Sequence, residues 1–494
     1  MTGLPASGIV PPKSNPELIH MNNSKKTRTL VMKFGGTSVG TPEAMRQAVE
    51  IVCQTRQDWP RLVVIASALS GVTNQLLASA TRAAHGDVQM LYQTESKLRE
   101  AHFVVADRLV TEPARCAQVK QEVQHLIADF MNLCQAISVL GEATPRALDA
   151  VAGLGERMSV RLMAAGLEVI GVPAQIVEAT QLIITDNRFQ DAHPDFEATT
   201  QRTLQFLEPV LAQGRVPVVT GFIAATREGV TTTLGRGGSD YSAGILGAAL
   251  SADEVWIWTD VDGIMSADPR IVPNARTIPE LTYREIAELA YFGAKVLHPK
   301  TIRPVIEKGI GLRVCNTFNP SHPGTRLTNN GTETDVVIKA VTAIHGLRLV
   351  TIEGRGMLGV PGVAARTFGA VASTSTSVPL ITQASSEQSI CFAVPTESAE
   401  KVVAAVKQAF SNELSNRDIE RIWADEDVVI ITVVGAGMQK IPGVAGKVFS
   451  ALGDANVNVI AIAQGSSEVS ISLVVAAQDA DNGVRTIHKL IIKE

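Results

Sequence analysis

Two stretches near the end of the chain repeat each other at a constant spacing of 81 residues. The matching pieces are Pro361-Gly362-Val363-Ala364 with Pro442-Gly443-Val444-Ala445, and Gln383-Ala384-Ser385-Ser386-Glu387 with Gln464-Gly465-Ser466-Ser467-Glu468. A constant spacing over such a span predicts two copies of one folded unit. The periodicity of apolar residues predicts the order βαββαβ for the first copy and the same order without a sixth strand for the second.

The missing sixth strand predicts an insertion. The strand-like run Val336–Ile344 lies just before the first copy and would fill the vacancy, since an unpaired sheet edge is usually avoided. The first copy, residues 347–424, is then expected to be inserted into the second. The second would consist of residues 335–346 together with 425–494.

The preceding part of the chain alternates between strand-like and helical patterns. Strands are expected at residues 62–66, 169–170, 216–221, 254–259 and 312–314, with amphipathic helices at 43–55, 204–213 and 240–249. This alternation predicts an α/β fold with a mainly parallel sheet and helices on both faces. Residues 29–330 are expected to form this domain. Residues 1–28, rich in Pro, Ser and Asn, are expected to be a disordered tail.

Composition excludes several classes of partner. The formal net charge is −5 and no basic block occurs, so no binding of nucleic acid is expected. No apolar stretch approaches the roughly 18 residues that span a membrane, so no membrane association is expected. The five cysteines are scattered, which favours reduced thiols and a cytoplasmic location. The histidines are isolated, and no residue is predicted to hold a metal.

A glycine-rich turn with a lysine before it predicts a phosphate site. Lys33-Phe34-Gly35-Gly36-Thr37-Ser38 follows the buried strand pattern of residues 29–32 and precedes a helix start at Thr41-Pro42. Glycine lets the backbone approach an anion, and a helix N-terminus adds partial positive charge. The lysine precedes the glycines, unlike the lysine of the usual P-loop.

Other polar motifs each allow a functional and a plain structural interpretation. Gly235-Arg236-Gly237-Gly238-Ser239-Asp240 is a second glycine-rich turn before a helix, and Gly293-Ala294-Lys295 a third, although any such turn can be an ordinary loop. Thr259 and Asp260 follow a strand, where open α/β sheets bind ligands, or they form a simple turn.

Several hydroxyl, carboxylate and amide side chains can likewise have either a functional or a structural role. Ser67 and Thr73 follow the second strand and either face a substrate or cap a helix. Glu156 opens a helix, where it either binds a ligand or satisfies the helix dipole. Gln383 and Gln464 occupy equivalent places in the two repeats and either bind a small polar effector or close a strand end.

Taken together, the motifs resemble those of aspartate kinases in the amino-acid kinase superfamily. They are Lys33 to Val39, Thr233 to Asp240, Thr259 to Gly263, Phe292 to Pro299 and the tandem repeat. The resemblance covers the chain from about Leu30 onward, and the regulatory half most resembles the kinase portion of fused aspartate kinase–homoserine dehydrogenases. It implies a three-layer α/β kinase domain with a mainly parallel central sheet, followed by two ferredoxin-like βαββαβ ACT domains.

The resemblance also implies roles for single residues. The catalytic residues would be Lys33, Arg236 and Asp240. The residues that bind the substrate L-aspartate would be Ser67, Thr73, Glu156, Arg236 and Asp240. The nucleotide would be bound by Lys33, Gly35, Gly36, Thr259, Asp260, Arg270 and Lys295. Met265 stands where several relatives have a tyrosine.

The implied reaction is phosphorylation of the side-chain carboxylate of aspartate by ATP with Mg²⁺, the first step toward lysine, threonine and methionine. An amino acid, threonine rather than lysine, would inhibit through Gln383 and Gln464, and a homodimer or homotetramer would form through the ACT domains. Two alternatives stay open at this point. One is a kinase for glutamate or a nucleoside monophosphate, and the other is an amino-acid sensor without catalytic activity.

Overall fold

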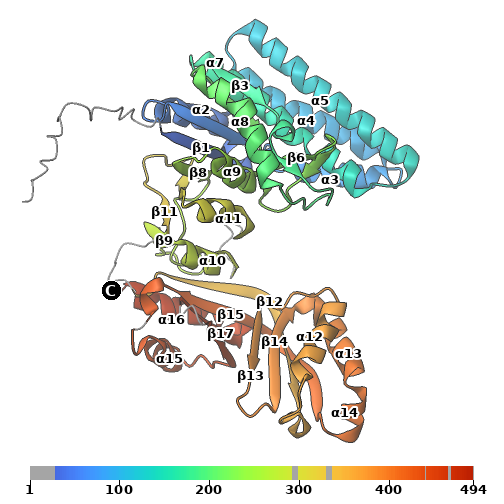
Figure 1. Cartoon of the computed structure of the whole chain (residues 1–494), viewed down its shortest axis with the longest axis vertical. Helices are drawn as coiled ribbons and strands as arrows, with labels where there is room; N and C mark the ends of the chain where they lie inside the picture. The colour runs from blue at the N-terminus through green and yellow to red at the C-terminus, as the bar shows by residue number, and fades with distance from the viewer. Residues whose placement is uncertain are drawn as a thin grey trace, which may run out of the picture.

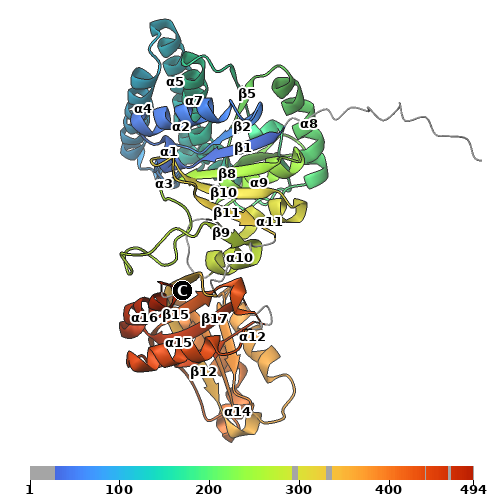
Figure 2. The same ribbon diagram turned by 90° about the vertical axis from the view of Figure 1, so that its left-hand side faces the viewer.

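The computed structural model describes residues 28–291, 297, 299–329, 337–439, 441–465 and 469–492. Figure 1 shows two parts, with β1 to β11 and their helices in the upper part and β12 to β17 with α12 to α16 in the lower part. Helix α10 lies where the two parts meet, which Figure 2 shows from the side.

An eight-stranded sheet forms the centre of the upper part. Its strands, in spatial order, are β3 (Ala174–Val177), β5 (Val216–Thr220), β2 (Arg61–Ala66), β1 (Thr29–Phe34), β8 (Glu254–Thr259), β10 (Gly311–Asn316), β11 (Thr325–Thr328) and β9 (Glu280–Thr282). All neighbouring strands are parallel except the β10–β11 pair. A small second sheet contains β4 (Ile184–Thr185), β6 (Ile223–Thr226) and β7 (Thr231–Thr233).

Helices cover both faces of the large sheet. Leu30, Met32 and Phe34 of β1 belong to one hydrophobic core, whereas Val31 between them belongs to another. Side chains alternate between the two faces of a strand, so each core lies on its own side of the sheet. The helices on the first side are α1 (Gly36–Val39), α2 (Pro42–Thr55), α3 (Val72–Ala83), α4 (Val88–Leu109), α5 (Pro113–Leu140), α6 (Pro145–Ala152) and α7 (Leu154–Val169). Those on the second side are α8 (Phe196–Ala212), α9 (Gly238–Ala249), α10 (Tyr283–Tyr291) and α11 (Pro299–Lys308). The predicted three-layer α/β architecture is confirmed.

The expected strand at residues 169–170 is wrong. Val169 is the last residue of α7, and Gly171 ends the helix with a left-handed φ of 82°. β-branched residues favour strands by propensity, but this preference is weak and the packing of α7 overrides it. The strand forms after the turn, as β3.

The expectation on apolar stretches also needs correction. By length and composition alone, α5 is the one helix among the described residues that could span a membrane. Its buried residues recur every three or four positions, as in Val119, Val123, Ile127, Phe130 and Cys134, and they belong to the first hydrophobic core. This spacing is typical of a helix that packs one face against a protein core.

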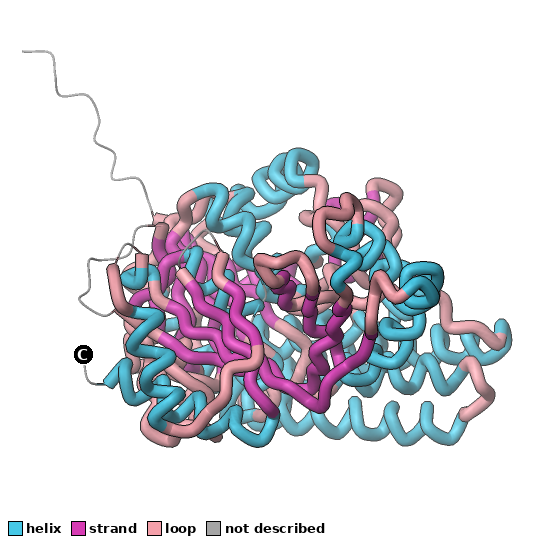
Figure 3. Tube along the Cα trace, turned by 90° about the horizontal axis from the view of Figure 1, so that it is seen from below, coloured by secondary structure: helices cyan, strands magenta, loops and turns pink. Residues whose placement is uncertain are grey.

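The lower part is one antiparallel sheet of six strands. In spatial order they are β13 (Leu380–Gln383), β14 (Ser389–Pro395), β12 (Ala340–Glu353), β15 (Arg421–Val434), β17 (Ser470–Ala476) and β16 (Ala461–Ala463). Its helices are α12 (Val363–Ser373), α13 (Ala399–Ala409), α14 (Ser411–Asn416), α15 (Val444–Asp454) and α16 (Ala480–Ile492). Figure 3 looks onto this part from below, with strands in magenta.

The two long central strands serve both repeats. Residues 340–344 of β12 pair with residues 430–434 of β15, next to the second repeat, whereas residues 347–353 pair with β14 of the first. The strand before the first repeat therefore lies beside the second one. The boundaries 347–424 and 335–346 with 425–494 stay a prediction.

Candidate active site

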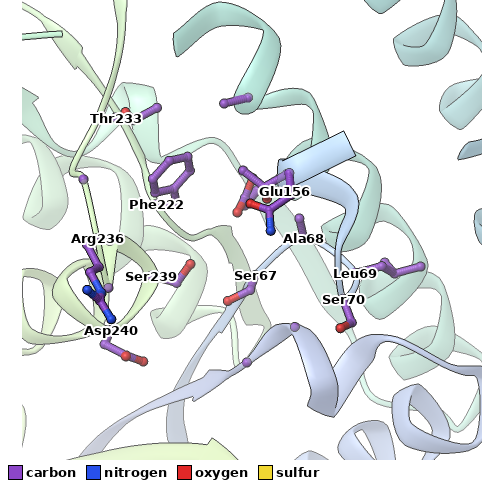
Figure 4. A pocket seen from close by; sticks show the side chains of 18 of the residues that line it. Ser67, Ala68, Leu69, Ser70, Glu156, Phe222, Thr233, Arg236, Ser239 and Asp240 are labelled. Atoms are coloured by element: carbon purple, nitrogen blue, oxygen red, sulfur yellow. The ribbon is translucent and has the colours of Figure 1, made fainter. Parts of the chain in front are cut away.

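A cavity of about 690 Å³ opens at the carboxyl end of the central strands of the large sheet. The loops after β1 and β2, the start of α7 and the loop before α9 enclose it. Figure 4 shows Arg236, Ser239 and Asp240 on one side and Glu156 with Ser67 to Ser70 on the other. The predicted site residues that line it are Lys33, Gly35, Gly36, Ser67, Thr73, Glu156, Arg236, Asp240 and Thr259.

Lys33 places a buried cation in this cavity. It is the fifth residue of β1, and its Nζ lies 2.6 Å from Oδ1 of Asp240. A Cβ on Gly35 would come within 3.4 Å of this Nζ, so glycine leaves room around the ammonium group. The pair joins β1 to the first turn of α9, which are far apart in the sequence. It leaves the remaining protons of the ammonium group for a ligand.

The glycine-rich turn differs in detail from the prediction. The short helix α1 begins at Gly36, with Gly35 as its N-cap, and precedes α2. Thr41 caps α2 by accepting from the N–H of Ala44. The N–H of Gly35 donates to the carbonyl of Trp258 at 3.1 Å, so this donor already has a partner. Gly36 and Thr37 line the cavity.

Glu156 is a carboxyl group enclosed by protein on the opposite side. It is 3% exposed, and its Oε2 has no hydrogen-bond partner in the part of the chain that the structure describes. Burial raises the pKa of this carboxyl to about 7. Hydrogen bonds from backbone N–H groups lower the pKa, but their effect is smaller than that of burial. A group of this kind is suited to receive a positively charged ligand.

The second glycine-rich loop presents Arg236 to the cavity. Gly235 and Gly237 on either side have left-handed φ values of 75° and 71°, which glycine adopts without strain. Arg236 is exposed and makes no ion pair with another described residue. Its guanidinium group is therefore available to bind a carboxylate or phosphate with two hydrogen bonds.

Asp149 is a lining residue that the sequence motifs did not reveal. It lies on α6 and is buried, and it accepts hydrogen bonds from the N–H of Gln190 and from both the N–H and the hydroxyl of Thr233. These bonds fix the strand that leads to Arg236. No pattern around Asp149 distinguishes it from an ordinary helical aspartate.

Asp260 and Arg270, two further predicted nucleotide residues, do not line the cavity. Asp260 is exposed and accepts from the hydroxyl of Thr259 at 3.1 Å. Arg270 pairs with Asp268 at 2.6 Å, and its side chain is 83% exposed. Lys295 lies outside the described residues.

The two predicted effector residues lie near the edges of the six-stranded sheet. Gln383 ends β13 and Gln464 follows β16, and both are exposed. These strands are the first and last in the sheet, yet Leu380 of β13 and Ala461 of β16 contribute to one hydrophobic cluster. The sheet therefore curves and brings its two edges close together.

Comparison with known families gives two matches. The model of the amino acid kinase family matches residues 28–316, and an ACT domain model matches residues 350–410 and 431–490. These matches agree with the resemblance that the motifs predicted.

Curated relatives are similar along most of the chain. The bifunctional aspartokinase/homoserine dehydrogenase of Haemophilus influenzae is 36% identical over 466 residues, which are 93% of this chain and 56% of that protein. The chloroplastic aspartokinase 3 of Arabidopsis thaliana is 33% identical over 487 residues, 96% of this chain and 83% of that one. The chain spans about half the length of the bifunctional relatives that it matches.

Solved structures share the whole architecture. The crystal structure of E. coli aspartokinase III with aspartate and ADP (R-state) has a TM-score of 0.77 and 30% identity, covering 94% of this chain and 100% of that one. The structure of the same enzyme with lysine and aspartate (T-state) has a TM-score of 0.74 and 32% identity, covering 94% and 99%.

Proposed function

This chain belongs to the amino acid kinase family and, within it, to the aspartokinases, and we propose that it transfers the γ-phosphoryl group of ATP to the side-chain carboxylate of L-aspartate. The product is 4-phospho-L-aspartate, and the reaction is the first step toward lysine, threonine and methionine. The observation that carries the proposal is one cavity in which Lys33, Arg236, Asp240 and Glu156 meet. E. coli aspartokinase III, which has the same fold, was crystallised with aspartate and ADP.

The polar groups of the cavity suit the three charges of aspartate. Glu156 and Asp240 bind its ammonium group, and Arg236 binds a carboxylate through both guanidinium branches. Ser67 and Thr73 line the same side and supply hydroxyl groups. These interactions place the acceptor carboxylate toward Lys33.

The phosphates lie over the turn after β1. Lys33 stabilises the charge that develops on the transferred group, while Gly35 and Gly36 keep the backbone close to it. Thr259 lines the same cavity. Asp260, Arg270 and Lys295 are the further nucleotide residues that the family resemblance implies.

Mg²⁺ would be held largely by the phosphate oxygens of ATP. The described residues contain no group of three His, Cys, Asp or Glu side chains arranged to hold a metal. The cavity instead offers separate carboxylates, such as that of Asp240, which would fit an ion that keeps water and phosphate oxygens as its other ligands, as Mg²⁺ commonly does. The ion would supply neutralisation of the phosphate charge.

The reaction requires no general base. The acceptor carboxylate of aspartate is ionised at neutral pH and attacks without loss of a proton. Catalysis then depends on bringing two anions together in the correct geometry. Lys33 and Arg236, the two cationic side chains among the described residues that line the cavity, serve this purpose.

An assay of ADP release with three acceptor conditions tests the proposal. Aspartate should support turnover, whereas glutamate and buffer without an acceptor should not, and hydroxylamine should trap the acyl phosphate. Turnover with glutamate alone would favour the alternative kinase. Equal ADP release without an acceptor, or none at all, would contradict the proposal.

Replacing Lys33 tests the phosphate role. We expect Lys33→Ala to lower kcat by about 10²- to 10³-fold, because one preorganised charge at the transferring group is removed. Lys97→Ala, at an exposed position of α4, is the matched control and should leave kcat unchanged. Wild-type kcat in the folded Lys33→Ala variant would reject the assignment.

Regulation is proposed to act through the ACT repeats. A small amino acid binds near Gln383 and Gln464, with threonine favoured over lysine by the likeness to the bifunctional enzymes, although the E. coli structure contains lysine. A homodimer or homotetramer forms through the same sheet edges. A cytoplasmic location stays a prediction.

A substitution at the sheet edge tests the effector site. Gln383→Ala should shift the inhibition curve to higher effector concentration without changing kcat, because an amide contact to the effector is lost. Titrations with threonine, lysine and both together measure this shift. Gln408→Ala, on the exposed side of α13, is the control, and unchanged inhibition in Gln383→Ala would remove Gln383 from the site.

A further inference from the structure

Phe318 is a solvent-exposed aromatic side chain outside the lining of the cavity, at the same end of the large sheet. It lies in the loop after β10 and is 57% exposed, in a chain with few aromatic residues. No aromatic ring among the described residues stacks on it. An exposed phenylalanine at the ligand-binding end of a parallel sheet calls for a physical explanation.

The loop that carries Phe318 is fixed from both sides by one carboxylate. Asp262 Oδ1 accepts from the Nδ2 of Asn316 at 2.8 Å and from the Nδ2 of Asn319 at 3.0 Å. The Oδ1 of Asn316 in turn accepts from the N–H of Phe318 at 2.9 Å. The exposed ring thus projects from an ordered backbone.

The residue before Phe318 connects the loop to the candidate phosphate site. The N–H of Thr317 donates to the carbonyl of Thr259 at 2.9 Å. Its hydroxyl donates to the hydroxyl of Ser38, 2.7 Å away, on the helix that follows Gly35. Phe318 is therefore held in a fixed relation to the loops after β1 and β8.

The order of the strands places Phe318 where a nucleotide base would lie. The phosphates lie at the end of β1, the next strand outward is β8, and the one after it is β10, which Phe318 follows. Neighbouring strands are about 4.8 Å apart, so the end of β10 is about 10 Å from the end of β1. A nucleoside triphosphate that is bound by its phosphates at β1 reaches this distance with its base.

The other aromatic residues near this edge are engaged elsewhere. Trp258 is buried and stacks on Phe34, with ring centres 5.9 Å apart. Phe222 lines the cavity on the side of Arg236. Met265, where relatives carry a tyrosine, is half-buried and accepts from the hydroxyl of Thr277 through its sulfur at 3.5 Å.

We propose that Phe318 is the platform on which the purine base of the nucleotide stacks. This inference rests on the proposed function, because it takes the phosphates to be bound at Lys33. Base–aromatic stacking depends on the ring alone, so the contribution should belong to the base and not to the phosphates. Aspartate binding should be independent of it.

Calorimetric titration with ADP and with inorganic triphosphate separates the two parts of the ligand. Phe318→Ala should weaken ADP binding about tenfold, as loss of one stacked base predicts, and leave triphosphate binding unchanged. Phe318→Trp should restore ADP binding. Phe196→Ala, an exposed phenylalanine at the start of α8, is the matched control and should alter neither titration.

The outcomes distinguish this inference from the proposed function. Unchanged ADP binding in Phe318→Ala, or equal weakening of ADP and triphosphate, would overturn the stacking role. If wild-type protein binds ADP but does not phosphorylate aspartate, the proposed reaction is refuted. The titrations of Phe318→Ala with ADP and triphosphate would then still decide whether the base stacks on Phe318. Wild-type protein that binds neither ligand would overturn both.

Discussion

At the scale of single residues, the chemistry of Glu156 depends on what surrounds it. The same carboxylate on the surface would ionise well below neutral pH, whereas enclosure between α7 and the loop after β2 raises its pKa to about 7. The ion pair of Lys33 and Asp240 places opposite charges on the other side of the cavity. The motifs predicted all three residues but not the protonation state of Glu156.

The pH dependence of aspartate binding follows from this protonation state. An ammonium group favours the ionised form of Glu156, so the KM for aspartate should rise as pH falls below 7, approaching tenfold per pH unit. KM measured between pH 5.5 and 8.5 tests this. Glu156→Gln should have a high KM with no such slope, and a wild-type KM that is constant across this range would contradict the prediction.

The same carboxyl group should also make the free energy of unfolding depend on pH. In the unfolded chain Glu156 has its ordinary pKa of 4.5, whereas in the folded protein without ligand its pKa is about 7. The native state therefore binds the extra proton between these values, and the free energy of unfolding should fall as pH rises through this window. Denaturant titrations of wild type and Glu156→Gln at pH 5 and pH 8 measure the difference.

At the scale of elements, the start of α7 lies unusually close to the loop after β2. A Cβ on Gly155 would lie 2.7 Å from the Cβ of Ala68 and 3.2 Å from Cγ1 of Val72. Glycine permits this approach, and the approach brings Glu156 into the cavity beside Ser67. The sequence showed Gly155-Glu156 as a helix start but not this contact.

Gly155→Ala should separate α7 from that loop. We expect a loss of about 1–3 kcal/mol in the free energy of unfolding, because a methyl group is forced into a filled space, together with a higher KM for aspartate. Gly369→Ala in α12 is the control, since a methyl group added there would have nothing within 4 Å and helix propensity predicts a gain of about 1 kcal/mol. Equal effects of the two substitutions would contradict the packing argument.

At the scale of the whole molecule, α10 connects the catalytic part to the regulatory sheet. Glu285 on α10 is fully buried and accepts from Nζ of Lys339 at 3.1 Å and from the N–H of Ala436 at 2.7 Å, both in the regulatory part. Nearby, Ser470 donates to Glu288 at 2.8 Å. These polar contacts orient one part relative to the other.

Removing one partner of the buried pair should be costly. Lys339→Met leaves Glu285 buried without its counter-charge, and we expect a loss of about 3–5 kcal/mol in the free energy of unfolding. Thermal and denaturant unfolding measure it. Arg303→Met breaks the exposed pair with Glu307 on α11 and should leave Tm unchanged. A Lys339→Met protein as stable as wild type would contradict the structural importance of the pair.

The amino-acid sequence was enough to predict the alternation of strands and helices, the tandem repeat and the glycine-rich turns, because these depend on local periodicity and on backbone conformations that few residues adopt. Only the packed structure shows that Lys33 meets Asp240, that Asp149 supports the Arg236 loop, that burial raises the pKa of Glu156 to about 7, and that α10 joins the two parts. Such properties arise from contacts between distant segments and from exclusion of water, and neither is written in any short stretch of residues.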